Sequence, residues 1–156
     1  MNPQNYDKFI EIVRRKTGII LGPDKQYLVE SRLKPLAETS GVADVDALLL
    51  KIFQFGEEKL QDVVVDAMTT NETFFFRDET PFKSLAEALP ELAERRRGAP
   101  IRIWSAACST GQEPYSLAII AQEVQDQHPQ VKVDIVGTDI SDRCLTKARA
   151  GIYSQF

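Results

Sequence analysis

The sequence has few of the residues on which most nucleophilic and metal sites depend. Its 156 residues include one histidine, two cysteines and one tryptophan. His128 stands in a polar stretch beside Pro129, and Cys108 and Cys144 have neither a CxxC partner nor a histidine cluster. These absences exclude Ser/His/Asp and Cys/His catalysis and argue against a metal site.

An excess of basic residues is also missing. The chain has 19 Lys and Arg against 23 Asp and Glu, a net charge of −4. Binding to nucleic-acid phosphates requires the opposite balance, so we expect no nucleic-acid partner. The basic cluster 95–97 precedes Gly98 and is more typical of a solvated turn. Hydrophobic residues make up 43% and charged residues 27%, which is the composition of a globular protein.

Long hydrophobic runs are absent as well. No apolar stretch approaches the ~20 residues that a membrane-spanning helix needs. The first ten residues, MNPQNYDKFI, lack the basic and apolar segments of a secretory signal. We therefore expect a cytoplasmic protein with reduced thiols and no direct membrane insertion.

Residues 1–70 predict an all-α N-terminal domain. Apolar residues recur on one helical face between Pro3, which suits a helix start, and Gly18, which suits a helix end. Three more helical patterns follow, and we expect Pro35 to kink or interrupt the first of these. Residues 71–100 predict a linker and a helix, in which Pro90 is a second interruption.

Residues 101–156 predict the beginning of an α/β domain. A short β-favouring run leads into small residues at 105–111, and a helical pattern follows to residue 127. A second apolar run, 131–138, ends at Asp139 and precedes another helix. This βαβα order can bind a nucleoside, and the apolar second strand is typical of a parallel strand buried on both faces. The fold class is thus α+β in two parts.

Two groups of residues in this second part are candidates for ligand contact. The small side chains at 105–111, hereafter the small-residue loop, permit close backbone approach, although a tight turn in any α/β protein explains them equally well. Asp139 can accept hydrogen bonds from both ribose hydroxyls or can cap the next helix, a role that Ser141 can also fill.

Two further candidates carry charge. Glu113 directly follows the loop, where it can accept a cationic ligand group or simply stabilise the helix dipole. Arg77 follows the phenylalanines 74–76. Either these aromatic rings form a wall from which Arg77 binds a carboxylate, or they join the two parts of the chain and Arg77 is solvated.

Four ordered segments closely resemble the CheR-type chemoreceptor glutamate methyltransferases. They are MTTNETFFFRD at 68–78, RIWSAACSTGQEPYSLA at 102–118, GTDIS at 137–141 and KARAGIY at 147–153. TGIIL at 17–21 and SRL at 31–33 extend the resemblance into the helical part. The resemblance implies a Rossmann-like class I methyltransferase domain beginning at residue 101. It also implies transfer of a methyl group from S-adenosylmethionine to receptor glutamates, giving S-adenosylhomocysteine and γ-glutamyl methyl esters, without a metal.

The resemblance also assigns roles to particular positions. Arg77 is the expected catalytic residue, near the methionine carboxylate or the reaction centre. Glu113 is expected to hold the cofactor amino group and Asp139 the ribose. The full set of expected cofactor contacts is Asn71, Thr73, Arg77, Ala107, Gly111, Glu113 and Asp139. For the acidic methylation region of the receptor, the helical domain offers Arg32 and Lys34.

The family continues beyond this point of its methyltransferase domain, so we expect 1–156 to be a fragment or to pair with another chain. Two strands leave open sheet edges and an uncovered apolar face, which favour self-association. The main alternative function is a non-catalytic receptor- or partner-binding module with an incomplete nucleoside site. A nucleic-acid methyltransferase would require a basic surface and base-stacking aromatics near the site.

Overall fold

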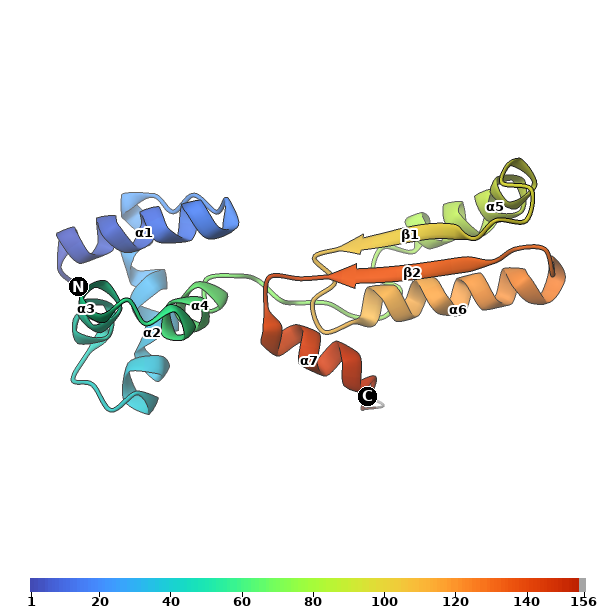
Figure 1. Ribbon diagram of the computed structural model, residues 1–156. Coiled ribbons are helices and arrows are strands. Elements are labelled where there is room, and N and C mark those ends of the chain that lie inside the picture. Colours follow the sequence, from blue (N-terminus) through green and yellow to red (C-terminus); the bar gives the residue numbers. More distant parts are fainter. Residues whose placement is uncertain (155–156) are drawn as a thin grey trace. The chain divides into compact units, whose positions relative to one another are not determined.

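The computed structural model describes residues 1–154 and divides the chain into two compact units, Met1–Thr70 and the remainder from Asn71 onward. The first unit is entirely helical, and the second contains helices and a two-stranded parallel sheet (Figure 1). This is the predicted α+β order, with a βαβα arrangement in the second unit. Along residues 1–154, no helix is both long and apolar enough to cross a bilayer.

The helical unit packs its helices around one hydrophobic core. Its elements are α1 (Pro3–Thr17), the 3₁₀ turn η1 (Pro23–Lys25), α2 (Gln26–Thr39), α3 (Val45–Phe55) and α4 (Glu58–Asp66). Every α-helix contributes fully buried side chains, namely Val13, Leu33, Leu48, Leu49 and Val64. Buried residues recur at helical spacing within a helix, as Phe9 and Val13 do in α1 and Val29 and Leu33 do in α2, so these helices turn one apolar face inward.

The ends of α1 follow the predicted signals. The Asn2 side chain accepts a hydrogen bond from the Gln4 N–H at 2.8 Å, and Pro3 occupies the first helical position. Gly18 ends the helix with φ 76°, in the left-handed region that glycine adopts without a steric penalty. The predicted first helix is confirmed.

The helix interruptions expected at two prolines are wrong, and the kink that was the other outcome expected at Pro35 stays a prediction. Helix α2 runs through Pro35, and α5 (Glu79–Arg95) runs through Pro90. Pro35 and Ser31, whose carbonyl loses its helical partner, are both exposed, so water can solvate that carbonyl. The apolar face of α2 includes the buried Val29, whereas Tyr27 is 66% exposed.

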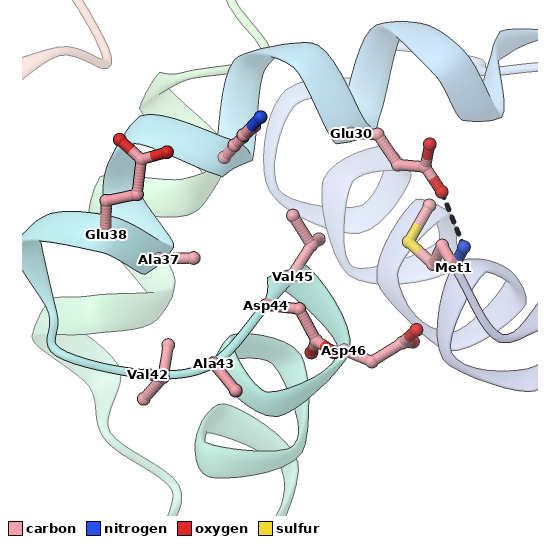
Figure 2. A pocket seen from close by; sticks show the side chains of 10 residues that line it. Met1, Glu30, Ala37, Glu38, Val42, Ala43, Asp44, Val45 and Asp46 are labelled. Carbon is pink, nitrogen blue, oxygen red and sulfur yellow. Dashed lines mark hydrogen bonds and ion pairs between the residues drawn. The ribbon is translucent and has the colours of Figure 1, made fainter.

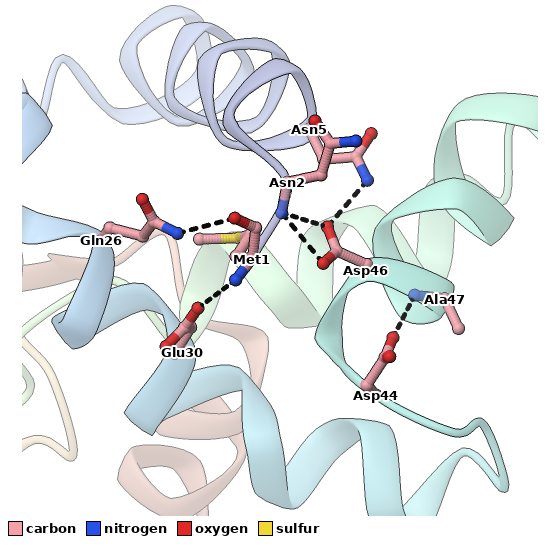
Figure 3. Close-up of polar contacts among 8 residues, drawn as sticks. All are labelled: Met1, Asn2, Asn5, Gln26, Glu30, Asp44, Asp46 and Ala47. Carbon is pink, nitrogen blue, oxygen red and sulfur yellow. Dashed lines mark hydrogen bonds and ion pairs between the residues drawn. The ribbon is translucent and has the colours of Figure 1, made fainter.

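The start of α1 is fixed to α3 and α2 by polar contacts (Figure 3). The Asp46 carboxylate accepts hydrogen bonds from the Asn2 N–H at 2.9 Å and from the Asn5 side-chain amide at 2.8 Å. The Gln26 side chain donates to the Met1 carbonyl at 2.8 Å. These bonds join segments that are distant in sequence and fix how α1 enters the helical unit.

The α/β unit consists of α5, β1 (Ile101–Ala106), α6 (Gln112–Gln127), β2 (Val133–Thr138) and α7 (Asp142–Ala150). The strands are parallel and in register from Ile101 opposite Val133 to Ala106 opposite Thr138. A small core of Leu89, Ala93, Ile101, Ala121 and Val131 joins α5 and α6 to the sheet. Both strands therefore end beside the small-residue loop, at the carboxyl edge of the sheet (Figure 1).

Strand β2 is not buried on both faces, contrary to the expectation from its apolar sequence. Val136 is 45% exposed, and its register neighbour Trp104 on β1 is 71% exposed. The buried side chains of the sheet pack toward α5 and α6, so only that face is covered within residues 71–154. The uncovered apolar face is the one predicted from the strand count.

Candidate functional site

The small-residue loop adopts an unusual backbone between β1 and α6. Ala107 and Ser109 have φ values of 61° and 48°, in the left-handed region that residues with a Cβ rarely adopt. Gly111 follows with φ 99°. Such conformations persist only where surrounding contacts maintain them, and they are concentrated at functional sites.

Asp139 supplies the first of those contacts. One carboxylate oxygen accepts a hydrogen bond from the Ser109 N–H at 2.7 Å, and the other accepts one from the Ser141 N–H at 2.9 Å. Ser141 itself caps α7, because its hydroxyl accepts from the Cys144 N–H at 3.2 Å. A carboxylate has about four lone-pair sites, so Asp139 can still accept hydrogen bonds from a ligand hydroxyl.

Glu113 lies in the first turn of α6 with its side chain exposed. Its Oε1 accepts a hydrogen bond from the Ser105 hydroxyl at 2.6 Å. Ser105 is buried at the end of β1, so the strand sets the direction of the Glu113 carboxylate. The exposed carboxylate can accept further hydrogen bonds, as an ammonium group would require.

The segment before α5 is tied to the loop and to α6. The Ser109 hydroxyl donates to the Asn71 carbonyl at 2.7 Å. The Phe76 N–H donates to the Ser116 hydroxyl at 2.9 Å, and Ser116 is fully buried on α6. Thr73 lies between these two attachments and is half-buried. The small-residue loop, the linker (residues 71–78, before α5) and Asp139 thus form one hydrogen-bond network that centres on Ser109.

Arg77 is oriented by its own segment. Its Nη1 donates to the Glu72 carbonyl at 3.0 Å, and the guanidinium carbon lies 5.6 Å from the centroid of the Phe74 ring. The Nε atom is 3.9 Å from an Asp78 carboxylate oxygen, and the side chain is 52% exposed. The guanidinium stacks on one of the phenylalanines and has further donors with which it can bind a carboxylate.

Ser105 and Ser109 are site residues that the sequence analysis missed. Both serines belong to the small side chains at 105–111, but their hydroxyls also orient Glu113 and hold Asn71. The signal was present in the sequence, since Ser105 lies at the end of the β-favouring run and Ser109 in the turn that follows it. Hydroxyl donors in such a turn commonly satisfy nearby acceptors.

A cavity of about 400 Å³ adjoins the loop through Cys108 and is lined by Tyr115, Ile135, Gly137 and Leu145 among others. Neither Glu113 nor Asp139 lines it. Burial, followed by the charge of Asp139, raises the pKa of the Cys108 thiol, which keeps this group protonated and unreactive at neutral pH. Within residues 1–154, no three His, Cys, Asp or Glu side chains cluster as metal ligands.

The two basic residues of the helical unit lie in different environments. The Arg32 guanidinium donates to the Met68 carbonyl at 2.8 Å, and to the carbonyls of Ala67 and Thr69 at 3.3 Å. Arg32 therefore holds the chain that leaves α4. Lys34 is exposed at a cavity of about 300 Å³. The acidic residues lining this cavity are Glu30, Glu38, Asp44 and Asp46 (Figure 2).

Comparison with known families matches both units. Residues 4–69 match the all-alpha domain of CheR methyltransferase, and residues 71–156 match the SAM-binding domain of CheR methyltransferase. The chain belongs to the CheR methyltransferase family. The predicted family resemblance and fold class are thereby confirmed.

Individual relatives agree with the CheR assignment. The chain is 46% identical to chemotaxis protein methyltransferase 1 of Vibrio cholerae over 98% of its length, which is 56% of that protein. It is 46% identical to chemotaxis protein methyltransferase 1 of Pseudomonas aeruginosa over 96% of its length, again 56% of that protein. Identity to the chemotaxis protein methyltransferase of Salmonella typhimurium is 32%, over 98% of this chain and 51% of the relative. The chain spans about half the length of the curated relatives that it matches.

Proposed function

We propose that the protein transfers a methyl group from S-adenosylmethionine to glutamate side chains of chemoreceptors, giving γ-glutamyl methyl esters and S-adenosylhomocysteine. The observation that carries the proposal is the strained small-residue loop flanked by two carboxylates. Asp139 holds this loop through the Ser109 N–H, and Ser105 orients Glu113 at its far end. An acid after each of two parallel strands suits a ligand that has a ribose and a positively charged amino group.

The residues around the loop fit this cofactor. Glu113 has an exposed carboxylate at a helix N-terminus, which suits the ammonium of a methionine moiety. Arg77 presents the opposite charge for the methionine carboxylate. Ala107 is exposed in the loop and leaves room for close backbone approach, whereas the space beside Gly111 is filled by Tyr153 and Ala148. Asn71 and Thr73 belong to the linker, which Ser109 joins to the loop through the Asn71 carbonyl. When bound, the cofactor supplies an electrophilic methyl group on a sulfonium.

The acceptor glutamate needs no general base. Its ordinary pKa is about 4.3, so it is already ionised at neutral pH. The contribution required of the protein is to align this carboxylate with the sulfonium methyl group and to exclude water. Arg77 is the proposed catalytic residue because its guanidinium can orient a carboxylate while stacked on Phe74.

Calorimetry with S-adenosylhomocysteine tests the cofactor site. We expect Glu113→Gln and Asp139→Asn each to weaken binding about 10- to 100-fold, because each removes a charge-assisted hydrogen bond. Glu123→Gln, an exposed acid on the same helix, is the matched control and should leave affinity unchanged. Equal affinity of Glu113→Gln and the control would contradict the assignment.

A methylation assay tests the reaction itself. Incubation with labelled S-adenosylmethionine and a chemoreceptor methylation region should transfer label that mild base releases, as expected of an ester. Label that resists base would exclude a γ-glutamyl ester. An Arg77→Lys variant should lose more activity than cofactor affinity, because lysine cannot reproduce the planar guanidinium.

The alternative function is a partner-binding module with an incomplete nucleoside site. The exposed sheet face around Trp104 and Val136 favours it. Failure of the chain to bind S-adenosylhomocysteine while it retains receptor affinity in a pull-down would support this alternative. Self-association through the sheet edge stays a prediction that size-exclusion chromatography tests.

Receptor contact through the helical unit belongs to the same proposal. Lys34 is the informative residue, because Arg32 is engaged with backbone carbonyls and its substitution would also disturb the end of α4. Lys34→Glu should weaken capture of an acidic receptor segment, and unchanged capture would remove Lys34 from the interface. Chemoreceptor methylation regions are cytoplasmic, and a cytoplasmic location also fits the two free, buried cysteines.

A further inference from the structure

The hydroxyls of two tyrosines form hydrogen bonds that join the small-residue loop and α6 to α7 and the residues after it. The Tyr153 hydroxyl donates to the carbonyl of Thr110, in the small-residue loop, at 2.7 Å. The Tyr115 hydroxyl, in the first turn of α6, donates to the Ala148 carbonyl of α7 at 3.1 Å. The two bonds run in opposite directions between the same pair of segments.

Each tyrosine hydroxyl lies directly over a glycine of the opposite segment. A Cβ built on Gly111 would lie 2.6 Å from the Tyr153 hydroxyl and 2.9 Å from the Ala148 Cβ. A Cβ on Gly151 would lie 2.7 Å from the Tyr115 hydroxyl. Both glycines have positive φ, so the close approach and the turn geometry demand the same residue.

The Tyr153 ring extends the contact to the linker. It packs edge-to-face on Phe75 with centroids 5.0 Å apart, and on Tyr115 with centroids 5.6 Å apart. One side chain therefore contacts the linker, the loop and α6. Burial, followed by the nearby Tyr115, raises the pKa of Tyr153, which keeps its hydroxyl a hydrogen-bond donor at neutral pH.

We propose that Tyr153 is a positioning residue for cofactor binding, whose hydroxyl fixes the Thr110 carbonyl and through it the left-handed turn at 107–111. The inference rests on the proposed function of this loop. Asp139 holds the loop on one side through Ser109, and Tyr153, which follows α7, holds the next residue, Thr110. Without the second attachment the loop samples more conformations, and binding must then order it at a cost in affinity.

The test compares Tyr153→Phe with Tyr115→Phe. Both variants lose one hydroxyl of the same cluster and retain the ring contacts, but only Tyr153→Phe releases a loop carbonyl. Amide hydrogen exchange of residues 106–112 should accelerate about fivefold or more in Tyr153→Phe and stay within about twofold of wild type in Tyr115→Phe. Affinity for S-adenosylhomocysteine should fall about five- to tenfold in Tyr153→Phe alone, with kcat at saturating cofactor retained.

The two readouts separate the inference from the proposed function. Unchanged loop exchange in Tyr153→Phe would overturn the positioning role whatever the cofactor result. Faster loop exchange with unchanged affinity would also overturn it, since the order of the loop would then not matter for binding. If the wild-type chain binds no S-adenosylhomocysteine, the proposed function fails for this chain, and with it the link between Tyr153 and cofactor binding. Equal changes in both variants would indicate a general packing role.

Discussion

The helical unit and the α/β unit are stabilised in different ways. In the helical unit, every α-helix contributes apolar side chains to one closed core, and residues such as Phe9, Leu33 and Leu48 are at most 1% exposed. In the α/β unit, a few residues form the core, while Trp104 and Val136 remain exposed on the sheet. Around the predicted site, the segments are held instead by side-chain hydroxyls, by the Asp139 carboxylate and by the rings of Phe75, Tyr115 and Tyr153. The first unit thus depends on one closed apolar core, and the second on polar and aromatic contacts around the predicted site.

The largest expected effect concerns the closed core. Leu48→Ala should lower the free energy of unfolding by about 2–5 kcal/mol, because the site is fully buried and the surrounding helices cannot collapse into the cavity. Leu50→Ala on the same helix is the control, since Leu50 is 42% exposed. Urea unfolding monitored by circular dichroism measures both. Similar losses in the two variants would show that the core is less well packed than the structure indicates.

A pair of glycines gives the next effect and contrasts the two units directly. Gly111→Ala combines a positive φ with collisions against Tyr153 and Ala148, so it should cost about 2–4 kcal/mol. Gly56 ends α3 with φ 60°, and a Cβ built on it meets no atom within 4 Å. Gly56→Ala should therefore lower the free energy of unfolding by only about 1 kcal/mol. Thermal unfolding measures each variant. If Gly56→Ala were the more damaging, the crowding around the loop would not be what constrains Gly111.

Asp46 tests whether a polar attachment also matters in the helical unit. Burial raises the pKa of Asp46, but hydrogen bonds from Asn5 and the Asn2 N–H outweigh it, and the net pKa lies below the ordinary 3.8. Its stabilising contribution is therefore complete above that value and disappears as the pH falls through the lowered pKa. Asp46→Asn should cost about 1 kcal/mol at neutral pH.

Urea unfolding from about pH 6 down to about pH 2 should show a wild-type advantage over Asp46→Asn that is constant above about pH 5 and shrinks as more acid is added. Asn5→Ala should add little in an Asp46→Ala background, because both changes remove the same hydrogen bond. A constant advantage across this range would show that the Asp46 carboxylate is not the group responsible.

The smallest expected effect lies on the uncovered sheet face. Trp104→Ala should change the free energy of unfolding by less than about 0.5 kcal/mol, because the side chain is 71% exposed and its indole N–H bonds only to the nearby Thr138 hydroxyl. Trp104 is the only tryptophan, so acrylamide quenching reports its exposure in the wild type. Strong protection from quencher, or a loss of several kcal/mol, would show that something covers this face in solution.

The sequence predicted those features that depend on local pattern. Pro3 and Gly18 bound the first helix, and Ser141 caps the last one, because these residues act through their immediate neighbours. It failed at Pro35 and Pro90, where the helix continues through the proline. At Pro35 the exposed surroundings let water solvate the carbonyl that loses its helical partner. The apolar second strand predicted two buried faces, but burial depends on which elements pack against the sheet. No local pattern records that arrangement.

The types of residue at the candidate site could be predicted from the sequence, whereas the hydrogen bonds that join them could not. Small residues followed by Glu113, and a strand ending at Asp139, are visible in the sequence. The bond between Ser109 and Asn71 and the bond between Tyr153 and Thr110 join residues 38 and 43 positions apart. Such pairs become apparent only when the fold brings the segments together. The roles of Asn71, Thr73, Arg77, Ala107, Gly111, Glu113 and Asp139 in cofactor binding stay predictions.

The 43-residue separation between Thr110 and Tyr153 has a consequence for synthesis. At typical translation rates, the ribosome makes the loop about 2–9 seconds before it makes the tyrosine that fixes it. The helical unit, whose contacts lie within its own 70 residues, can fold during that interval. The loop cannot form its hydrogen bond to Tyr153 until that residue has left the ribosome. Nascent chains that stop before residue 153 should therefore carry a folded helical unit and a loop that lacks its attachment to Tyr153.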